Sequence, residues 1–375
     1  MLNRRNGLVL LLPTFLLAFA ASAEPFGIGT VYVAHPVVQL NDENNASATI
    51  RYQCTSALTC DLILYDRTPS EVRTLFAAKH HEPGIYEATW RGRDDSDNPV
   101  RNGYYFIKMI GRPSGAILFD SASTDWGHTI VAEDLFASRD AKIMYKLSQN
   151  AVVHVGLGHE GTGGYFRTLV DWKARPKGRH VETWDGYDAS GKVCLIDRSN
   201  TLVQVVAYSL PEQTVIVTGS RTETLPVKKE DSEYIVPSAR NTNQIEDISI
   251  YARQADVLCR TPLFAIEAVD QKGAAFDLDR SFLSVPVVIR IKPDSETKKA
   301  LLFEPYKIAV FIDDSLVHEG EESCDDFAFW LYPKQFSSGA HVLNVNVIRD
   351  LGAHVGAAMT RFCVAEEGVR DSGGR

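Results

Sequence analysis

After residue 23, the sequence has no apolar run long enough to cross a membrane as a helix. It also lacks an excess of basic residues, because 39 Lys and Arg stand against 48 Asp and Glu and give a formal net charge of −9. Binding to nucleic-acid phosphates depends on clustered Lys and Arg, so the acidic balance argues against such a partner. We therefore expect neither a transmembrane segment after residue 23 nor a nucleic-acid ligand.

A long helical period is also absent after residue 23, as is any set of residues that could act together as nucleophile, base and oxyanion donor. Short runs rich in Val, Ile, Phe and Tyr dominate instead, bounded by turn clusters such as Asp94–Pro99 and Asp188–Lys192. The predicted strands include Tyr104–Ile110, Thr201–Tyr208, Thr214–Thr218, Val287–Ile291, Ile308–Ile312, Phe327–Tyr332 and Val342–Ile348. Short strands at these intervals predict an all-β fold built from β-sandwiches.

One of these strands shows a regular alternation. Leu343, Val345 and Val347 alternate with Asn344 and Asn346. Successive side chains of a strand point to opposite faces of the sheet, so this pattern predicts one buried face and one solvated face.

The amino terminus has the features of a secretory signal peptide. Arg4 and Arg5 form a basic start, Leu8–Ala20 is an apolar stretch, and Ala21–Ala23 is a small-residue cleavage site. The apolar stretch is too short for a stable membrane anchor. The residues around the arginine pair fit a twin-arginine signal poorly, which favours the general secretory route. We expect cleavage after residue 23 and a periplasmic or extracellular location.

The six cysteines are Cys54, Cys60, Cys194, Cys259, Cys324 and Cys363. An even count together with export favours disulfides, and the absence of a C-x-x-C pair argues against zinc. Cys54 and Cys60 flank a short loop between the strand-like runs Ile50–Gln53 and Asp61–Tyr65, and a hairpin there would bring them close enough to bridge. We predict a Cys54–Cys60 disulfide. A second bridge among the three cysteines after Cys194 would leave Cys194 unpaired, and its pairing stays open.

A diverged tandem repeat organises the first half of the chain. Trp90 and Trp184 lie ninety-four residues apart in similar phrases, GIYEATW-RGRDDSDN and GRHVETW-DGYDASGK. The same spacing relates Arg73–Leu75 to Arg167–Leu169, Gly84 to Gly178, Gly92 to Gly186, and Asp94 to Asp188. A repeated sequence unit predicts a repeated structural unit.

Both copies resemble the immunoglobulin-like domain of the bacterial flagellar hook-capping protein, a module also found on exported bacterial proteins. The shared motifs are a V-R-T-L strand, a Gly, a W-D-G-x-D-x-x-G turn and a G-x-Y strand. The first copy matches at Val72–Leu75, Gly84, Trp90–Asp94 and Asn102–Tyr105, and the second at Phe166–Leu169, Gly178 and Trp184–Gly191. The resemblance covers about half the chain. It implies β-sandwiches used for spacing or adhesion.

This sequence departs from that family in three places. The first copy has Arg91 where the family has Asp and Asp97 where the family has Gly, and the second copy lacks the final G-x-Y. Further along, residues 306–320 and 338–356 resemble a generic bacterial immunoglobulin-like domain. The sequence therefore predicts tandem immunoglobulin-like β-sandwiches. The predicted parts are a signal peptide (1–23), two sandwiches (24–112 and 113–220), a polar linker (221–244), a third sandwich (245–365) and a tail (366–375).

Two acidic turns have an oxygen-rich spacing that could suit calcium. Their residues are Asp94, Asp95 and Asp97 in the first turn, and Asp185 and Asp188 in the second. Calcium takes six to eight oxygen ligands, but neither turn has the D-x-D-x-D-G order. Asp also bonds to backbone N–H groups in turns, and we favour that interpretation. We therefore expect no metal site, with these five residues as weak calcium candidates.

Other motifs are incomplete. Residues 156–161 fit G-x-G-x-x-G, but turn and strand residues follow where a dinucleotide site needs a helix. His80–His81 and the pair His154 and His159 have no third metal ligand at a defined spacing. Ser295–Lys298 fits S-x-x-K without the rest of the penicillin-binding signature. No cofactor is expected.

These observations favour a non-catalytic, exported structural or protein-interaction module of the bacterial cell envelope. Its partner would be a protein or an envelope surface, contacted through strand edges or loop tips. The alternative is an extracellular binder of carbohydrate or another surface ligand, with Trp126, Trp172 or Trp330 as an aromatic platform. An enzyme accessory protein is the third hypothesis.

Overall fold

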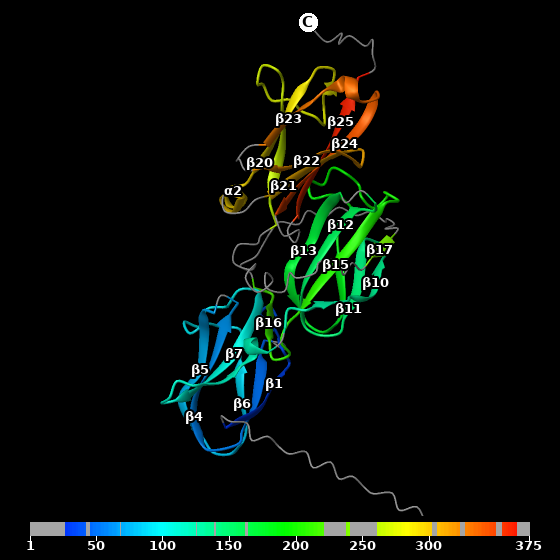
Figure 1. Ribbon diagram of the computed structural model, residues 1–375. Helices are drawn as coiled ribbons and strands as arrows, with labels where there is room; N and C mark the ends of the chain where they lie inside the picture. The colour runs from blue at the N-terminus through cyan, green and yellow to red at the C-terminus, as the bar shows by residue number, and fades with distance from the viewer. Residues whose placement is uncertain are drawn as a thin grey trace, which may run out of the picture.

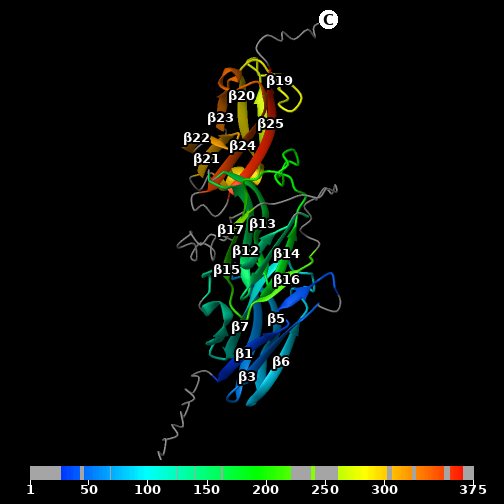
Figure 2. The ribbon, with the colours of Figure 1, turned by 90° about the vertical axis from the view of Figure 1, so that its right-hand side faces the viewer.

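Three β-sandwiches lie end to end in the computed structural model of the chain (Figure 1 and Figure 2). The structure describes residues 27–42, 46–67, 69–124, 126–138, 140–161, 164–220, 238–240, 261–301, 306–322, 327–349 and 355–365. The predicted signal peptide, most of the predicted linker and the predicted tail lie outside these residues. Within the described part of the chain, no helix is long and apolar enough to span a membrane. The predicted all-β fold of tandem immunoglobulin-like sandwiches is confirmed.

The first sandwich packs two sheets around one core. In spatial order, one sheet contains β1 (Ile28–Ala34), β3 (Ala48–Cys54) and β6 (Gly84–Trp90). The other contains β2 (Val37–Gln39), β16 (Val215–Thr218), β7 (Gly103–Arg112), β4 (Leu58–Asp66) and β5 (Glu71–His81), and β8 (Ile117–Asp120) also pairs with β7. Alternate residues of β3, Ala48, Ile50 and Tyr52, face inward and are at most 1% exposed. Period-2 burial of this kind is what a strand with one buried face requires.

The second sandwich repeats this arrangement with one difference at an edge. One sheet contains β10 (Glu133–Ala137), β11 (Lys142–Leu147) and β14 (Gly178–Thr183). The other contains β13 (Tyr165–Arg175), β12 (Ala151–His159), β15 (Thr201–Ser209) and the short β17 (Ser238–Arg240), and β9 (Thr129–Ile130) also pairs with β15.

The third sandwich has the same strand order as the first. One sheet contains β18 (Phe264–Val269), β20 (Val287–Pro293) and β23 (Phe327–Leu331). The other contains β19 (Phe282–Leu283), β25 (Val355–Val364), β24 (Gly339–Arg349), β21 (Tyr306–Ile312) and β22 (Ser315–Glu322). A short helix, α2 (Ser295–Leu301), follows β20, and the Asp294 side chain accepts a bond from Thr297 N at its start. The Ser295–Lys298 motif therefore lies on this helix.

The ninety-four-residue repeat is visible in the backbone. Trp90 is the last residue of β6, and Trp184 directly follows the equivalent β14. Ala78 and Trp172, at the same offset, both have a φ of 45°, in a region that side-chain-bearing residues rarely adopt. Both lie in the corresponding strands β5 and β13. The repeat therefore extends to an irregularity of the backbone that sequence letters alone do not reveal.

The predicted boundary between the first two sandwiches needs a correction. Val215–Thr218 falls within the predicted second unit, yet as β16 it pairs in parallel with β2 and antiparallel with β7 of the first sandwich. Ile216 N donates to Pro36 O at 2.7 Å, which ties β16 to the amino-terminal part of the chain. The second sandwich is therefore inserted between two consecutive strands of the first. A strand pattern predicts a strand, but it does not say which sheet the strand joins.

Candidate functional site

The acidic turns have the same geometry in both repeats. Asp94 Oδ1 accepts bonds from the backbone N–H groups of Ser96 and Asn98, at 2.9 and 2.8 Å. Asp188 accepts bonds from Ser190 N and Lys192 N, at the same offsets, and also from Val193 N. A carboxylate that accepts bonds from the residues two and four positions later closes the turn on itself.

The arginines of the repeat motif fasten these turns. Arg73 Nη1 donates to Asp94 O at 2.5 Å, and Arg167 Nη1 lies 3.4 Å from the equivalent Asp188 O. Arg167 Nη1 also donates to Asp185 Oδ1 at 2.5 Å. The arginine that the sequence repeat contains thus links β5 in the first sandwich, and β13 in the second, to the backbone of the turn.

Of the remaining calcium candidates, the carboxylates of Asp95 and Asp185 have protein donors. Asp95 Oδ1 accepts a bond from Thr74 N at 3.0 Å, and Asp97 has a left-handed φ of 64° in the first turn. Asp185 forms an ion pair with Arg167. Within the described residues, no three His, Cys, Asp or Glu side chains gather as metal ligands. Asp94, Asp95, Asp185 and Asp188 accept bonds from backbone N–H groups, and the absence of a metal site stays a prediction.

The structure corrects the hairpin expected at the first two cysteines. Cys54 ends β3 and Cys60 lies in β4, and these strands belong to opposite sheets of the first sandwich. Both cysteines are buried free thiols in one core, and burial raises the pKa of Cys60 to about 11. A disulfide here would link the two sheets, and it stays a prediction.

The histidines have different environments. His80 is exposed, whereas His81 is buried and lies 2.8 Å from the hydroxyl of Tyr52. His154 is 5% exposed on β12, and its Nε2 lies 2.7 Å from the hydroxyl of Tyr165. Burial lowers the pKa of His154 to about 4, so its ring is neutral near pH 7.

Packing accounts for the first glycine of the G-x-G-x-x-G motif. Gly156 lies in β12, where a Cβ would stand 1.8 Å from the hydroxyl oxygen of Tyr165. Gly158, in the same strand, faces the backbone carbonyl of Gly164, which a Cβ would approach to 2.9 Å. The motif therefore begins in a strand, where its first two glycines leave room for neighbouring residues, and ends in a turn. It does not begin a helix as a phosphate-binding loop would.

An apolar cluster joins the first and second sandwiches. Phe106 and Ile216 from the first meet Trp126 and Val152, and the Phe106 and Trp126 ring centroids are 5.4 Å apart. Ile216 lies in β16, whose flanking residues Val215 and Val217 belong to the core of the first sandwich. The second residue of this four-residue strand is thus buried in the joint, while the residues on either side of it are buried in the first core.

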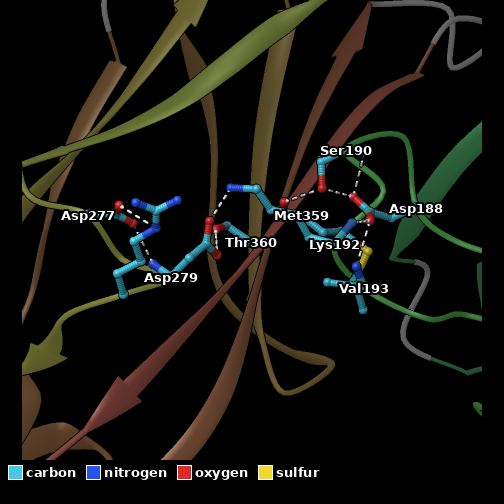
Figure 3. A network of polar contacts seen from close by, with 9 residues as sticks. Asp188, Ser190, Lys192, Val193, Asp277, Asp279, Met359 and Thr360 are labelled. Atoms are coloured by element: carbon cyan, nitrogen blue, oxygen red, sulfur yellow. Dashed lines mark hydrogen bonds and ion pairs between the residues drawn. The ribbon is translucent and has the colours of Figure 1, made fainter. Parts of the chain in front are cut away.

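A polar network joins the second and third sandwiches (Figure 3). Ser190 Oγ donates to Asp188 Oδ2 at 2.6 Å and lies 3.2 Å from the backbone oxygen of Met359 in β25, so its one hydroxyl hydrogen is shared between these two acceptors. Lys192 forms an ion pair with Asp279, whose other carboxylate oxygen accepts a bond from Thr360 Oγ1 at 3.2 Å. The second acidic turn, considered above as a calcium candidate, therefore contacts the third sandwich.

Two asparagines add to this second joint. Asn346 bonds both backbone groups of Tyr165, accepting from its N–H at 2.7 Å and donating to its oxygen at 2.6 Å. Asn344 Nδ2 donates to the same oxygen at 3.1 Å. The expectation of a solvated face here is wrong, because Asn344 and Asn346 are 2% and 1% exposed. Their strand is covered on both faces, by its own core and by the second sandwich.

Of the three tryptophans proposed as an aromatic platform, one is exposed. Trp126 is 7% exposed within the first joint, and Trp172 stacks on Tyr208 at 5.3 Å. Trp330 of β23 is 46% exposed, and its ring stacks on that of Tyr332, which is 43% exposed. The outer face of this sheet therefore carries an accessible aromatic pair.

A second exposed apolar row crosses the second sandwich. Phe136 of β10 is in register with Met144 of β11, and Met144 with Val181 of β14. Phe136 and Val181 are 54% and 55% exposed. Sequence reasoning missed this row, although the residues are apolar, because their alignment depends on strand register.

Comparisons with known proteins give only distant similarities. Neither a protein-family model nor a curated protein matches the sequence. Among solved structures, fibronectin(III)-like modules of CbhA from Clostridium thermocellum are 7% identical, with 89% of this chain and 94% of that chain covered, at a TM-score of 0.17. A bacterial ice-binding adhesin of 1.5 MDa is 8% identical, with 91% and 98% covered, at a TM-score of 0.17.

The native alpha-2-macroglobulin of E. coli is 9% identical, with 91% of this chain and 22% of that chain covered, at a TM-score of 0.18. These low scores give no information on function. The class of the protein follows from its own sheet order, which is shared by the first and third sandwiches and largely repeated in the second. The protein is a tandem array of immunoglobulin-like β-sandwiches.

Proposed function

We propose that the chain is a non-catalytic spacer and interaction module of the bacterial cell envelope, exported by its amino-terminal signal peptide. The observation that carries this proposal is that both joints between sandwiches are built from buried contacts. The first joint has an apolar core of its own, and the second has buried Asn344 and Asn346 bonded to Tyr165. A chain with fixed joints can hold its two ends apart, which a spacer requires.

The first joint is also crossed twice by the chain. The backbone enters the second sandwich after β8 and returns through β16. Two covalent connections with apolar packing between them resist both bending and twisting more than one flexible linker does. The second joint depends on buried hydrogen bonds of the Asn344 and Asn346 side-chain amides. Breaking such bonds costs free energy when water cannot replace the lost partner. These contacts support a fixed arrangement of the three sandwiches.

The resemblance of the repeats to the hook-capping immunoglobulin-like module supports the same class of function. That module occurs on exported proteins, and the signal peptide predicted at residues 1–23 would place this chain in the periplasm or outside the cell. The proposal concerns spacing and contact with the envelope, and it does not extend to flagellar assembly.

Fractionation and sedimentation test this proposal. The full chain, expressed in a bacterium, should yield a mature protein beginning at Glu24 in the periplasm or medium. The purified mature protein should sediment with isolated envelopes in a saturable manner. Two results would contradict the proposal. One is a chain that keeps residues 1–23 and stays in the cytoplasm, and the other is a mature protein that sediments with no envelope fraction.

Binding of a carbohydrate or another surface ligand is a second candidate, favoured by the exposed pair Trp330 and Tyr332. Flat aromatic rings provide a large apolar contact with little loss of side-chain entropy. If this function is correct, Trp330→Ala should reduce sedimentation with envelope polysaccharide at least tenfold. Phe282→Ala is the matched control, since Phe282 is 67% exposed elsewhere on the third sandwich, and it should have no effect.

A further inference from the structure

The outer face of the sheet β10–β11–β14 in the second sandwich carries an apolar row. Phe136, Met144 and Val181 lie in register across its three strands. Phe136 and Val181 are 54% and 55% exposed, and Met144 between them is partly buried. Contact of such a continuous patch with water costs free energy, which burial against another surface recovers.

The first sandwich shows that the fold does not require an apolar row at this place. Tyr32 is in register with Arg51, and Arg51 with Glu87, across the equivalent strands β1, β3 and β6. Arg51 Nε and Glu87 Oε1 form an exposed ion pair at 2.6 Å. The repeat and the strand register together match Arg51 to Met144 and Glu87 to Val181. The second copy therefore has apolar side chains where the same fold accepts charged ones.

Charged side chains of opposite sign flank the apolar row on its two edge strands. Glu133 and Asp134 lie on β10, and Arg179 lies on β14 in register with them through Lys146 of β11. Within one chain, Arg179 Nη2 lies 3.6 Å from Asp134 Oδ2, and Lys146 Nζ lies 2.7 Å from Glu133 Oε2. Both ion pairs are exposed, so water and salt weaken them and their partners are readily exchanged. One edge of the face is thus acidic and the other is basic.

Such a face is complementary to a second copy of itself in one orientation. A two-fold axis parallel to β11 places the β10 edge of one chain over the β14 edge of the other. Phe136 then meets Val181 of the second copy, and the carboxylates of β10 meet Arg179 of the second copy. A two-fold axis across the strands would instead place one acidic edge over the other, which repulsion between like charges disfavours.

The middle strand and the size of the face predict a weak dimer. Met144, Lys142 and Lys146 of β11 meet their own copies across the axis. Met144 adds apolar contact, and each lysine keeps the carboxylate that it is paired with, Asp140 or Glu133. Three strands about 4.8 Å apart and the 6 residues of β11 at about 3.4 Å each give a face of roughly 300 Å². A stable complex buries about 800 Å² on each partner, so we expect a dissociation constant in the high micromolar range.

We propose that a second copy of this chain docks on the outer face of β10–β11–β14 and forms a two-fold dimer. The apolar row provides the centre of the contact, and the acidic and basic edges set its orientation. The dimer places two chains side by side through their second sandwiches. It goes beyond the proposed spacer role and does not depend on it, since this face takes no part in either joint between sandwiches.

Sedimentation velocity of the mature chain tests the dimer, in a series from low to high micromolar protein. The sedimentation coefficient should rise with concentration toward that of a dimer. Met144→Arg with Val181→Glu introduces the charged pair that the first sandwich carries at Arg51 and Glu87, so the fold should tolerate it, and association should weaken at least tenfold. Ile85→Glu is the matched control, because Ile85 is 76% exposed on β6 of the first sandwich, and it should associate like the parent.

Charge reversal tests the orientation. Arg179→Glu in one variant, and Glu133→Lys with Asp134→Asn in another, each place like charges at both edges of a two-fold dimer. Asparagine suits the left-handed φ of 52° at Asp134. Each variant alone should associate at least fivefold more weakly than the parent. A mixture of the two restores opposite charges at both edges, so it should form a mixed dimer with the affinity of the parent.

Four results would overturn the proposal. A sedimentation coefficient that does not change with concentration would show that no second copy docks. Equal association of the parent and the Met144→Arg, Val181→Glu chain would place the dimer on another surface. Failure of the mixed charge variants to associate would exclude the two-fold orientation. A parent chain that stays monomeric but sediments with phospholipid vesicles, when the Met144→Arg, Val181→Glu chain does not, would make a lipid surface the occupant. The spacer role is tested separately by the joints and by binding to envelopes.

Discussion

Replacement of Val217 by alanine should destabilise the first sandwich, although this residue follows the second sandwich in the sequence. Val217 is 1% exposed and packs in the first core, next to Gly103 in β7. The substitution removes two buried carbon atoms, each contributing about 0.8 kcal/mol, and leaves a small cavity. We expect a loss of about 2 kcal/mol in the free energy of unfolding of the first sandwich.

Hydrogen exchange measured by mass spectrometry reports the stability of each sandwich separately. A single melting temperature of a three-domain chain does not. In the Val217→Ala chain, the slowest amides of β4 and β7 should exchange about 30-fold faster, since 1.4 kcal/mol corresponds to a factor of ten. Val181→Ala is the matched control because Val181 is 55% exposed, and it should change exchange little. Faster exchange confined to β12 and β15 would refute the assignment of β16 to the first sandwich.

Three further predictions concern single sites. Burial lowers the pKa of His154 to about 4 in the folded chain, so protonation favours unfolding, and the free energy of unfolding should fall as pH decreases from about 6.5 to 4. Urea titration at several pH values measures this fall, and an equal fall in the parent and in His154→Gln would contradict the prediction. Peptide mapping of exported protein without reductant should find Cys54 linked to Cys60 across the two sheets, and free thiols at both would refute the bridge. Chelation by EDTA should leave unfolding midpoints unchanged, because the carboxylates of Asp94 and Asp188 already accept backbone bonds; a fall of several degrees would make their turns calcium sites.

Much of the fold follows from local sequence. The strands at Tyr104–Ile110 and Val342–Ile348 lie within β7 and β24, because β-branched and aromatic residues in short runs between turn residues suit a pleated, half-buried surface. The equivalence of Trp90 and Trp184 followed from the repeat, which requires no knowledge of side-chain contacts. The turn roles of Asp94 and Asp188 were also predictable, since Asp bonds to nearby backbone N–H groups.

What the sequence did not predict depends on contacts between distant segments. Nothing in Val215–Thr218 indicates the first sandwich, because β7 lies about a hundred residues earlier in the chain. Asn344 and Asn346 look solvent-facing until the backbone of Tyr165 is brought against them. The apolar row through Met144 depends on the register of β10, β11 and β14. A shift of one residue between these strands would abolish the row.

We propose that the two joints hold the three sandwiches in one fixed arrangement. Distance measurement by electron paramagnetic resonance tests it most directly, with genetically encoded spin labels at Ile85 and Phe282, which are 76% and 67% exposed in the first and third sandwiches. Fixed joints predict a single narrow distance distribution in the parent chain. Asn346→Ala, which leaves the backbone groups of Tyr165 without two of their partners, should broaden it. A broad distribution in the parent, unchanged by Asn346→Ala, would contradict the claim.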